Sequence, residues 1–525
     1  MRLNLELPHE ERAILLDAQD VGRSLTDVMR REHLPLNTRC GERLLCNACT
    51  VDVLRDGVWQ PEPGCHLILD RDLTVRILQH AMLAYTPQVL SDYRINIPYA
   101  YDPLLGQKGL AVAVDVGTTT VALSLIDLAT GDVIAKATGF NRQMHFGDDV
   151  LTRINLCLSD PGALSTLQNA IIRETLLPLL NEAVTRAGAD PTQVKGYLLA
   201  GNATMLHLAA GINPGAMGTA PFMPSLINHE VRQAGILGLV PTNVPVHLLP
   251  GAAAYVGADI TGGVLTSGLV YDDGPSLLVD VGTNGEIVLK CGSHMFGCAT
   301  AAGPAFEGSG LRCGIRAGDG AISHVQLASD PFDVITEIIG PPRTKPIGIC
   351  GSAYIDFLSE GFRIGLLSAN GRLQPCEGAE SRLGRGDLGC EFIIGHGQGR
   401  RQIVITEPDI AKLLQAKAAI AAGILILLGR IGVKASDVKT LYLAGGFGMH
   451  LNITNAIACG FFPGFHPDQI QLVGNTSLAG AVLSAIDASV LSELERIGRE
   501  IEIVELNLDA DFEDTYIDQL TLSGV

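Results

Sequence analysis

Two loops of this chain carry residues that could hold phosphate groups and a divalent cation. They lie in VAVDVGTTT, residues 112–120, and in LLVDVGTNG, residues 277–285. Each apolar run predicts a buried strand, followed by a tight turn and a return strand. Glycine lets the backbone approach an anion, Thr and Asn offer donors, and Asp can hold hydrated Mg²⁺. The candidate residues are Asp115, Gly117, Thr118, Thr119, Asp280, Gly282, Thr283 and Asn284. For either loop alone, an ordinary β-turn is the alternative.

A second pair of segments repeats in the same order. VKGYLLAGN, residues 194–202, matches VKTLYLAGG, residues 438–446, and each follows a long helical pattern. The second helix is predicted to begin after Thr406, a suitable N-cap residue. Its strand ends in an open turn on which an adenine or ribose could lie, formed by Gly445, Gly446 and Phe447. Two unrelated repeats in the same order indicate a duplicated α/β domain.

Together, these loops and the Gly-Gly turn resemble the ASKHA superfamily of ATPases, which includes actin, hexokinase and the heat-shock chaperones. The resemblance implies two lobes that close over ATP, at residues 109–266 and 267–525. It also implies that Gly445, Gly446 and Phe447 face adenosine. In IGICGSAYID, the residues Gly348, Gly351 and Ser352 either complete this pocket or pack a helix against a strand.

Four cysteines near the start of the chain have the spacing of a metal site. Cys40, Cys46, Cys49 and Cys65 form C-x5-C-x2-C-x15-C, which is similar to the thiolate spacing of [2Fe–2S] ferredoxins. Strands predicted at LNLEL, TVDVL and LTVRI, with a short helix from Ser24 to His33, suit a β-grasp module over residues 1–79. Structural zinc and scattered core cysteines are the alternatives.

Composition favours a cytoplasmic redox protein. The chain has 525 residues and twelve cysteines, and those outside the cluster pattern are scattered singly, which argues against a disulfide scaffold. Charged residues and a proline near the start interrupt any secretory leader. A net charge of −19 argues against nucleic acid and anionic membranes. The longest apolar helical run, residues 418–429, is too short to cross a bilayer. We therefore expect neither nucleic acid nor a membrane as a partner.

Residues 80–108 are predicted to be a linker. The segment contains aromatic residues and prolines and has little periodicity. Because it lacks the Gly and Ser content of a flexible tether, we expect an extended strap that is partly docked. Such a strap would let the cysteine module move while keeping it near its target.

A ferredoxin-like module joined to a two-lobed ATPase is similar to the reductive activators of corrinoid-dependent enzymes, over nearly the whole chain. The segments that carry this resemblance are AGNATMLHLAAGINP, LLPGAAAYVGADI, AAGPAFEGSGLRCGIRA and LVGNTSLAGA. The resemblance implies ATP-supported reduction of a cob(II) centre to cob(I). The cob(II) centre would belong to a partner corrinoid protein or cobalamin-dependent methyltransferase. It also implies a [2Fe–2S] cluster, ATP and Mg²⁺ as cofactors, and an external low-potential electron donor. The oligomeric state stays open.

The resemblance suggests roles for individual residues in binding Mg²⁺ and phosphate and in moving protons. Asp115 and Asp280 are candidates for positioning Mg²⁺ and the attacking water, and the loop residues for cradling phosphates. Glu286 and Glu307 are candidate acid or base groups, with a solvated or salt-bridged carboxylate as the alternative. The Gly-rich segment with Ser309, Arg312 and Arg316 is either a surface that touches the corrinoid protein or a turn that closes the lobe.

The sequence departs from the family pattern at two places, and other functions stay open. The loop between Cys40 and Cys46 reads GERLL where relatives are glycine-rich, and we expect this chain to lack the separate middle region of longer relatives. One alternative is an activator of a 2-hydroxyacyl-CoA dehydratase. Such an activator would hold a [4Fe–4S] cluster between its subunits. A small-molecule kinase is a weaker alternative, because a kinase would have no use for a ferredoxin. The non-enzyme alternative is a nucleotide-switched scaffold with structural zinc.

Overall fold

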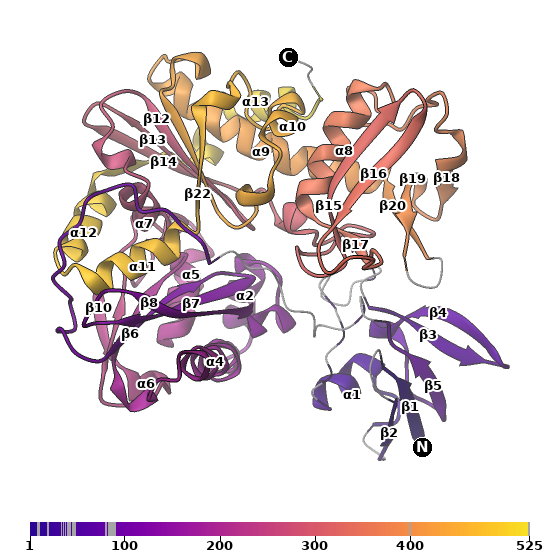
Figure 1. Cartoon of the computed structure of the whole chain (residues 1–525), viewed down its shortest axis with the longest axis horizontal. Coiled ribbons are helices and arrows are strands. Elements are labelled where there is room, and N and C mark those ends of the chain that lie inside the picture. The colour runs from indigo at the N-terminus through magenta and orange to yellow at the C-terminus, as the bar shows by residue number, and fades with distance from the viewer. Residues whose placement is uncertain are drawn as a thin grey trace. The chain divides into compact units, whose positions relative to one another are not determined.

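A computed structural model gives the structure of the chain (Figure 1). It describes residues 1–7, 11–17, 20–32, 34, 36, 38, 44, 49–78, 81, 91–397 and 401–522. The chain divides into two compact units, one of residues 1–88 and 305–413 and the other of residues 89–304 and 414–525. The domain limits expected at residues 79, 108 and 266 stay predictions.

The N-terminal segment forms a five-stranded mixed sheet with one helix. The strand order is β2-β1-β5-β3-β4, in which β1 pairs parallel with β5. The bounds are β1 (Arg2–Glu6), β2 (Glu11–Leu15), α1 (Leu25–Arg31), β3 (Thr50–Arg55), β4 (Val58–Pro63) and β5 (Leu73–Arg76). The three predicted strands and the helix are confirmed, and the Asp27 N–H donates to Ser24 Oγ at 3.2 Å as an N-cap should.

The sequence did not predict the two outer strands of this sheet. In β2 the only buried residue is Ile14, so the strand has no alternation of apolar and polar residues. In β4, Pro61 and Pro63 fall within the strand. Proline is tolerated at a sheet edge, where the backbone has no further partner, but it is a poor sign of a strand in a sequence.

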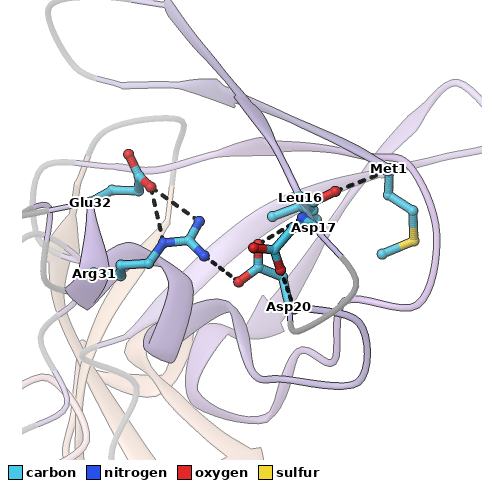
Figure 2. A network of polar contacts seen from close by, with 6 residues as sticks. All are labelled: Met1, Leu16, Asp17, Asp20, Arg31 and Glu32. Carbon is cyan, nitrogen blue, oxygen red and sulfur yellow. Dashed lines mark hydrogen bonds and ion pairs between the residues drawn. The ribbon is translucent and has the colours of Figure 1, made fainter.

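A network of polar contacts joins Asp17 and Asp20 to α1 (Figure 2). The buried carboxylate of Asp20 accepts from the Arg31 guanidinium, and Arg31 also contacts Glu32 at 3.1 Å. The N–H of Asp17 donates to Asp20 Oδ2 at 3.0 Å, and the Met1 amino group donates to the Leu16 carbonyl at 3.4 Å. A buried carboxylate held by a cation and a backbone donor thus ties Asp20 to Asp17 and to the end of α1.

The second unit contains two six-stranded sheets. The first lobe is built on the order β10-β11-β9-β6-β7-β8 and the second lobe on β22-β21-β12-β13-β14-β23. The first sheet consists of β6 (Leu110–Val116), β7 (Thr120–Asp127), β8 (Val133–Phe140), β9 (Val194–Ala200), β10 (Glu230–Gln233) and β11 (Pro245–Leu248). The second consists of β12 (Ser276–Val281), β13 (Gly285–Cys291), β14 (His294–Thr300), β21 (Thr440–Ala444), β22 (Ile470–Gly474) and β23 (Ile501–Ile503).

The two sheets share one topology, so the predicted duplication is confirmed. In each, three consecutive strands form an antiparallel meander, from β6 to β8 and from β12 to β14. The repeated segments then form β9 and β21, which pair parallel with the first strand of each meander. Only the outermost strands, β10 and β23, differ between the two.

Helices cover both sheets, and two of them lie between the lobes (Figure 1). α7 (Ala258–Thr266) packs on α11 (Thr476–Ile486), and α11 also packs on β6 and β9. At their crossing, a Cβ on Gly480 would lie 2.8 Å from the Cα of Gly262. The other helices of this unit are α2 (Val150–Ser159), α3 (Ala163–Ile171), α4 (Leu177–Ala187), α5 (Ala203–Ala210), α6 (Ala234–Leu237), α10 (Ile453–Ala458), α12 (Val490–Glu500) and α13 (Phe512–Asp518).

The described part of the predicted linker, residues 91–108, is extended and docked on this unit. The N–H of Arg94 donates to the Val473 carbonyl at 3.1 Å, that of Asn96 to Thr266 at 2.8 Å, and that of Asp102 to Ile486 at 3.0 Å. The prediction of an extended, partly docked strap is confirmed over these residues.

Residues 305–413 follow the second meander and form two three-stranded sheets and a helix. The sheet orders are β16-β15-β17 and β18-β19-β20. The elements are β15 (Ala321–Ser329), β16 (Phe332–Ile338), β17 (Gly348–Ile349), α8 (Gly351–Arg363), β18 (Leu383–Gly386), β19 (Gly389–His396) and β20 (Gln402–Thr406).

Helix α9 (Glu407–Arg430) is longer than its apolar run of residues 418–429 suggested. By length and composition it could cross a membrane, with a mean hydropathy of 1.8 over its most apolar 18 residues. However, 72% of that window is buried inside the protein, as expected for a core helix. The predicted N-cap is confirmed, since the Asp409 N–H donates to Thr406 Oγ1 at 3.3 Å.

We predict that Gly480→Ala destabilises the second unit. The added methyl group would meet the α7 backbone, which cannot yield as a flexible side chain can, and overpacking of this kind costs about 1–3 kcal/mol. The control is Gly429→Ala, at an exposed position of α9 where a Cβ meets no atom within 4 Å. Thermal unfolding followed by circular dichroism should give a lower midpoint for Gly480→Ala and an equal or higher one for the control. Equal midpoints for both variants would contradict tight packing at this crossing.

Candidate functional site

The two predicted phosphate loops lie against each other in the second unit. The first joins β6 to β7 and the second joins β12 to β13. Thr119 Oγ1 lies 3.4 Å from Thr283 Oγ1, so the loops meet through their hydroxyl groups. The duplication therefore places two similar turns on opposite sides of one site.

Asp115 is held by residues that follow β22, a strand of the second sheet. Its Oδ2 accepts from Asn475 Nδ2 at 2.9 Å, and its Oδ1 accepts from Ser477 Oγ at 2.7 Å. Asn475 caps α11 through the Leu478 N–H. Sequence reasoning had singled out LVGNTSLAGA as a family segment but had given Asn475 and Ser477 no role.

Four carboxyl groups influence one another at this site. Burial raises the pKa of Asp115, against the hydrogen bonds from Ser477 and Asn475. Burial and the charge of Asp115 raise the pKa of Asp280 to about 7. Burial and the charges of Asp280 and Asp115 raise the pKa of Asp259, and burial with the charges of Asp259 and Asp280 raises that of Glu286.

Two of these carboxyl groups reach the site from neighbouring elements. Glu286 is buried on β13 and lies directly opposite Asp280 in the antiparallel β12–β13 register. Asp259 lies in the first turn of α7 and was missed by sequence reasoning. Asp259 lies two residues after Gly257 in the family segment LLPGAAAYVGADI, but the sequence alone does not place this segment near Asp280.

The donor set suits a hydrated divalent cation. Clustered carboxylates repel one another, and a divalent cation would neutralise that charge. Over the described ranges, no three His, Cys, Asp or Glu side chains are arranged so as to hold a metal ion alone. Mg²⁺ usually takes one or two carboxylates and keeps several waters, so this arrangement fits Mg²⁺.

The Gly-Gly turn after β21 lies beside Asp280. Gly445 has φ +90°, and a Cβ there would lie 2.7 Å from Asp280 Oδ1 and 2.6 Å from the Val281 carbonyl oxygen. A Cβ on Gly446 would meet no atom within 4 Å. The ring of Phe447 lies 6.4 Å from that of Phe461. The turn therefore gives open backbone next to the acidic cluster, where a flat ligand group could lie.

The other predicted pocket residues belong to the first unit. A Cβ on Gly348 would lie 2.7 Å from the Cys313 carbonyl oxygen, Gly351 begins α8, and Ser352 Oγ donates to the Ser323 carbonyl at 2.7 Å. These contacts match the helix-to-strand packing alternative, and a place for these residues in a nucleotide pocket stays a prediction.

The Gly-rich segment of the first unit is held by internal contacts. Glu307 forms an ion pair with Arg316 at 3.6 Å, and the two side chains are 18% and 10% exposed. Ser309 is buried, and the Arg312 N–H donates to Asp409 Oδ1 at 2.8 Å. These contacts match the alternatives of a salt-bridged Glu307 and a structural turn.

Two of the four predicted thiolate ligands lie within the described residues. Cys49 and Cys65 are buried in the core of the N-terminal sheet. The Gly64 N–H donates to the Cys49 carbonyl at 2.9 Å, so the turn that carries Cys65 lies against Cys49. Cys40 and Cys46 lie outside the described residues. The described half of the ligand set is thus compatible with one shared site.

Comparison with known proteins identifies the class of this fold. A family model described as the C-terminal domain of RACo, the ASKHA domain, matches residues 274–524, and one described as the RACo middle region matches residues 110–272. Residues 274–524, which include the second sheet and its loop, therefore form a domain of ASKHA type.

Individual relatives give the family. The chain is 31% identical to the corrinoid activation enzyme RamQ of Eubacterium limosum, over 77% of this chain and 69% of the relative. It is 24% identical to a methylated amine-specific corrinoid protein reductase of Methanosarcina barkeri, over 74% and 72%. A solved structure named reductive activator for corrinoid, iron–sulfur protein is 26% identical, with a TM-score of 0.74 over 99% of this chain and 98% of the other. The chain belongs to the family of reductive activators of corrinoid proteins.

One expectation about this family was wrong. We expected the chain to lack the middle region of longer relatives, but that region matches residues 110–272. The middle region is the first lobe itself, which the sequence had shown only as one copy of a duplicated domain.

We predict that the acidic cluster makes the ligand-free protein less stable as the pH rises. The pKa of Asp280 is raised from its ordinary value of 3.8 to about 7, so the folded chain keeps a proton that the unfolded chain has lost. The free energy of unfolding should therefore fall between pH 4 and pH 7. Asp280→Asn should remove on the order of 1–3 kcal/mol of this fall.

The measurement is the thermal midpoint from pH 4 to pH 7 without Mg²⁺ or nucleotide. Asp273→Asn, an exposed position in the same unit, is the control and should keep the parent's pH dependence. If the midpoint of Asp280→Asn falls as steeply as the parent's, Asp280 is already ionised in the folded chain.

Proposed function

We propose that the protein is an ATP-dependent reductive activator of a corrinoid protein. It passes one electron from a [2Fe–2S] cluster to the cob(II) corrinoid of a partner methyltransferase or corrinoid protein and so regenerates cob(I). The observation that carries this proposal is the pair of facing loops with their acidic cluster, in a chain of this family that also has the four-cysteine pattern.

The nucleotide end of the mechanism rests on the second unit. Asp115 and Asp280 would position hydrated Mg²⁺ and the attacking water, and the Thr-rich loops would cradle the phosphates. When bound, Mg²⁺ neutralises charge on the phosphates. Glu286 and Asp259 interact electrostatically with Asp280, and their raised pKa values suit groups that hold or accept a proton. Gly445 and Gly446 would lie under the adenosine.

The redox end rests on the N-terminal sheet. Cys40, Cys46, Cys49 and Cys65 would hold the cluster, which supplies a one-electron donor when bound. The buried positions of Cys49 and Cys65 support this, because burial keeps water from the sulfur atoms. The rest of the sheet would hold the loop that carries these ligands.

The two ends need to be coupled because the electron transfer is unfavourable. Plant-type clusters lie near about −400 mV, and cob(II) corrinoids are harder still to reduce. For one electron, a gap of about 59 mV corresponds to about 1.4 kcal/mol. Closure of the lobes over nucleotide can shift such an equilibrium by a few kcal/mol, if the closed form binds the partner in its electron-accepting state more tightly. Changed axial ligation of the partner's cobalt would provide that difference.

We predict that cob(I) formation requires ATP and Asp280. Reduced protein, a strong reductant, Mg-ATP and a cob(II) corrinoid protein should give the cob(I) absorption band. Asp280→Asn should slow its appearance by about 100-fold or more, because a group that stabilises the phosphoryl transition state is lost. Asp273→Asn should retain the parent rate. Equal rates with and without ATP would contradict the proposed mechanism.

We predict that the N-terminal cysteines hold a [2Fe–2S] cluster. Anaerobically purified and reduced protein should show an S = 1/2 electron paramagnetic resonance signal of [2Fe–2S] type. Cys46→Ser should lose the signal and the cob(I) activity but retain ATP hydrolysis. Cys157→Ser, a buried cysteine of α2, is the control and should retain all three. A [4Fe–4S] signal would favour the dehydratase-activator alternative, and bound zinc without a signal would favour the scaffold.

A further inference from the structure

The backbone carbonyls of the first phosphate loop all point into the first lobe. The Gly117 carbonyl accepts from Asn141 Nδ2 at 2.9 Å, and the Thr119 carbonyl accepts from the Asn141 N–H at 2.8 Å. Between them, the Thr118 carbonyl accepts from Arg153 Nη2 at 2.6 Å. Three successive carbonyls of the loop are thus held by only two residues.

This arrangement sets the direction of the amide groups. In a trans peptide the N–H points opposite to the carbonyl of the preceding residue. The N–H groups of Thr118 and Thr119 therefore point away from Asn141 and Arg153. The side of the loop opposite Asn141 and Arg153 thus presents amide hydrogens rather than carbonyl oxygens, which favours an anion. The same loop contacts the second loop, because Thr119 Oγ1 lies 3.4 Å from Thr283 Oγ1.

Asn141 and Arg153 are themselves held firmly. Both are fully buried. Asn141 Oδ1 accepts from the Gln143 N–H at 3.0 Å, while Arg153 donates to Gln143 Oε1 and to the Gly147 carbonyl, each at 2.9 Å. Arg153 also brings a guanidinium charge directly behind the loop, where it adds to the attraction for an anion.

The second loop is built differently. There the Gly282 N–H donates to the Asn284 carbonyl at 2.9 Å, so one of its amide groups is used inside the turn. The two copies of the duplicated loop are therefore not identical, since in the first copy the carbonyls are held by Asn141 and Arg153.

We infer that Asn141 and Arg153 are positioning residues that orient the first loop to bind the phosphate groups of the nucleotide. The inference rests on the proposed function, because it requires ATP to bind between the loops. Neither residue needs to touch the nucleotide. Both act through the carbonyls that they hold, so their loss should weaken binding of the phosphates and leave binding of adenosine unchanged.

The test compares the affinities of the full chain for Mg-ATP and for adenosine by isothermal titration calorimetry. The dissociation constant for adenosine divided by that for Mg-ATP measures how much the phosphates contribute to binding. Arg153→Met should lower this ratio about 10-fold or more, while adenosine affinity stays within about twofold. Arg153→Lys, which keeps the charge and can reach one carbonyl, should recover part of the ratio.

Asn141→Ser gives a second, independent test if Arg153→Met does not fold. It keeps the backbone N–H but is too short to donate to the Gly117 carbonyl, and it should also lower the ratio. The matched control is His207→Gln, because His207 is a buried residue of the same lobe that accepts from the Ser225 and Leu226 N–H groups and does not contact the loop. This control should lose thermal stability and keep the parent ratio.

Two results would overturn the inference. One is an unchanged ratio in Arg153→Met and Asn141→Ser, and the other is an equal loss of ATP and adenosine binding, which would show a structural role only. A parent chain that binds neither ligand would instead overturn the proposed function.

Discussion

The site depends on contacts between the first phosphate loop and residues of the second half of the duplication. Asp115 lies one residue before the end of β6, yet its carboxylate is held by Asn475 and Ser477, which follow β22 of the second sheet. The Thr119–Thr283 contact joins the two loops directly. Because these bonds cross from one lobe to the other, the geometry of the site and the relative position of the lobes are linked. A ligand that changes one must change the other.

The acidic cluster adds an electrostatic constraint to this linkage. Asp115, Asp259, Asp280 and Glu286 raise the free energy of one another's ionised forms, and burial adds to the effect. The pKa values of these carboxyl groups are therefore raised, so the ligand-free cluster holds protons at a higher pH than separate carboxyl groups would. A cation such as Mg²⁺ would displace these protons, and its binding would then stabilise the clustered carboxyl groups. Under the proposed function, the charge that destabilises the ligand-free site would also favour binding of a cation together with its anionic nucleotide.

The sequence predicted the features that are local. Apolar runs with Asp and Gly at their ends predicted β6 and β12, Ser24 and Thr406 predicted helix starts, and the repeated segments predicted the matching topology of the two sheets. The contacts that complete the site are not local, since Asp115 and Asn475 are 360 residues apart. Asp259, Ser477, Asn141 and Arg153 carry no pattern that distinguishes them from other polar residues. Only the folded chain shows that they converge on the loops, and the edge strands β2 and β4 were missed because their residues are mostly exposed.

The docked strap has a mechanical consequence. Its backbone bonds to Val473 and Ile486, which belong to the second half of the duplication, and also to Thr266, which ends the first half. The Lys136 amine of β8 adds a further bond to the Ser91 carbonyl at 2.9 Å. A segment fastened to both halves cannot stay unchanged when one rotates against the other. It must bend, slide or release a bond, so the strap would respond to any ligand that moves one half against the other.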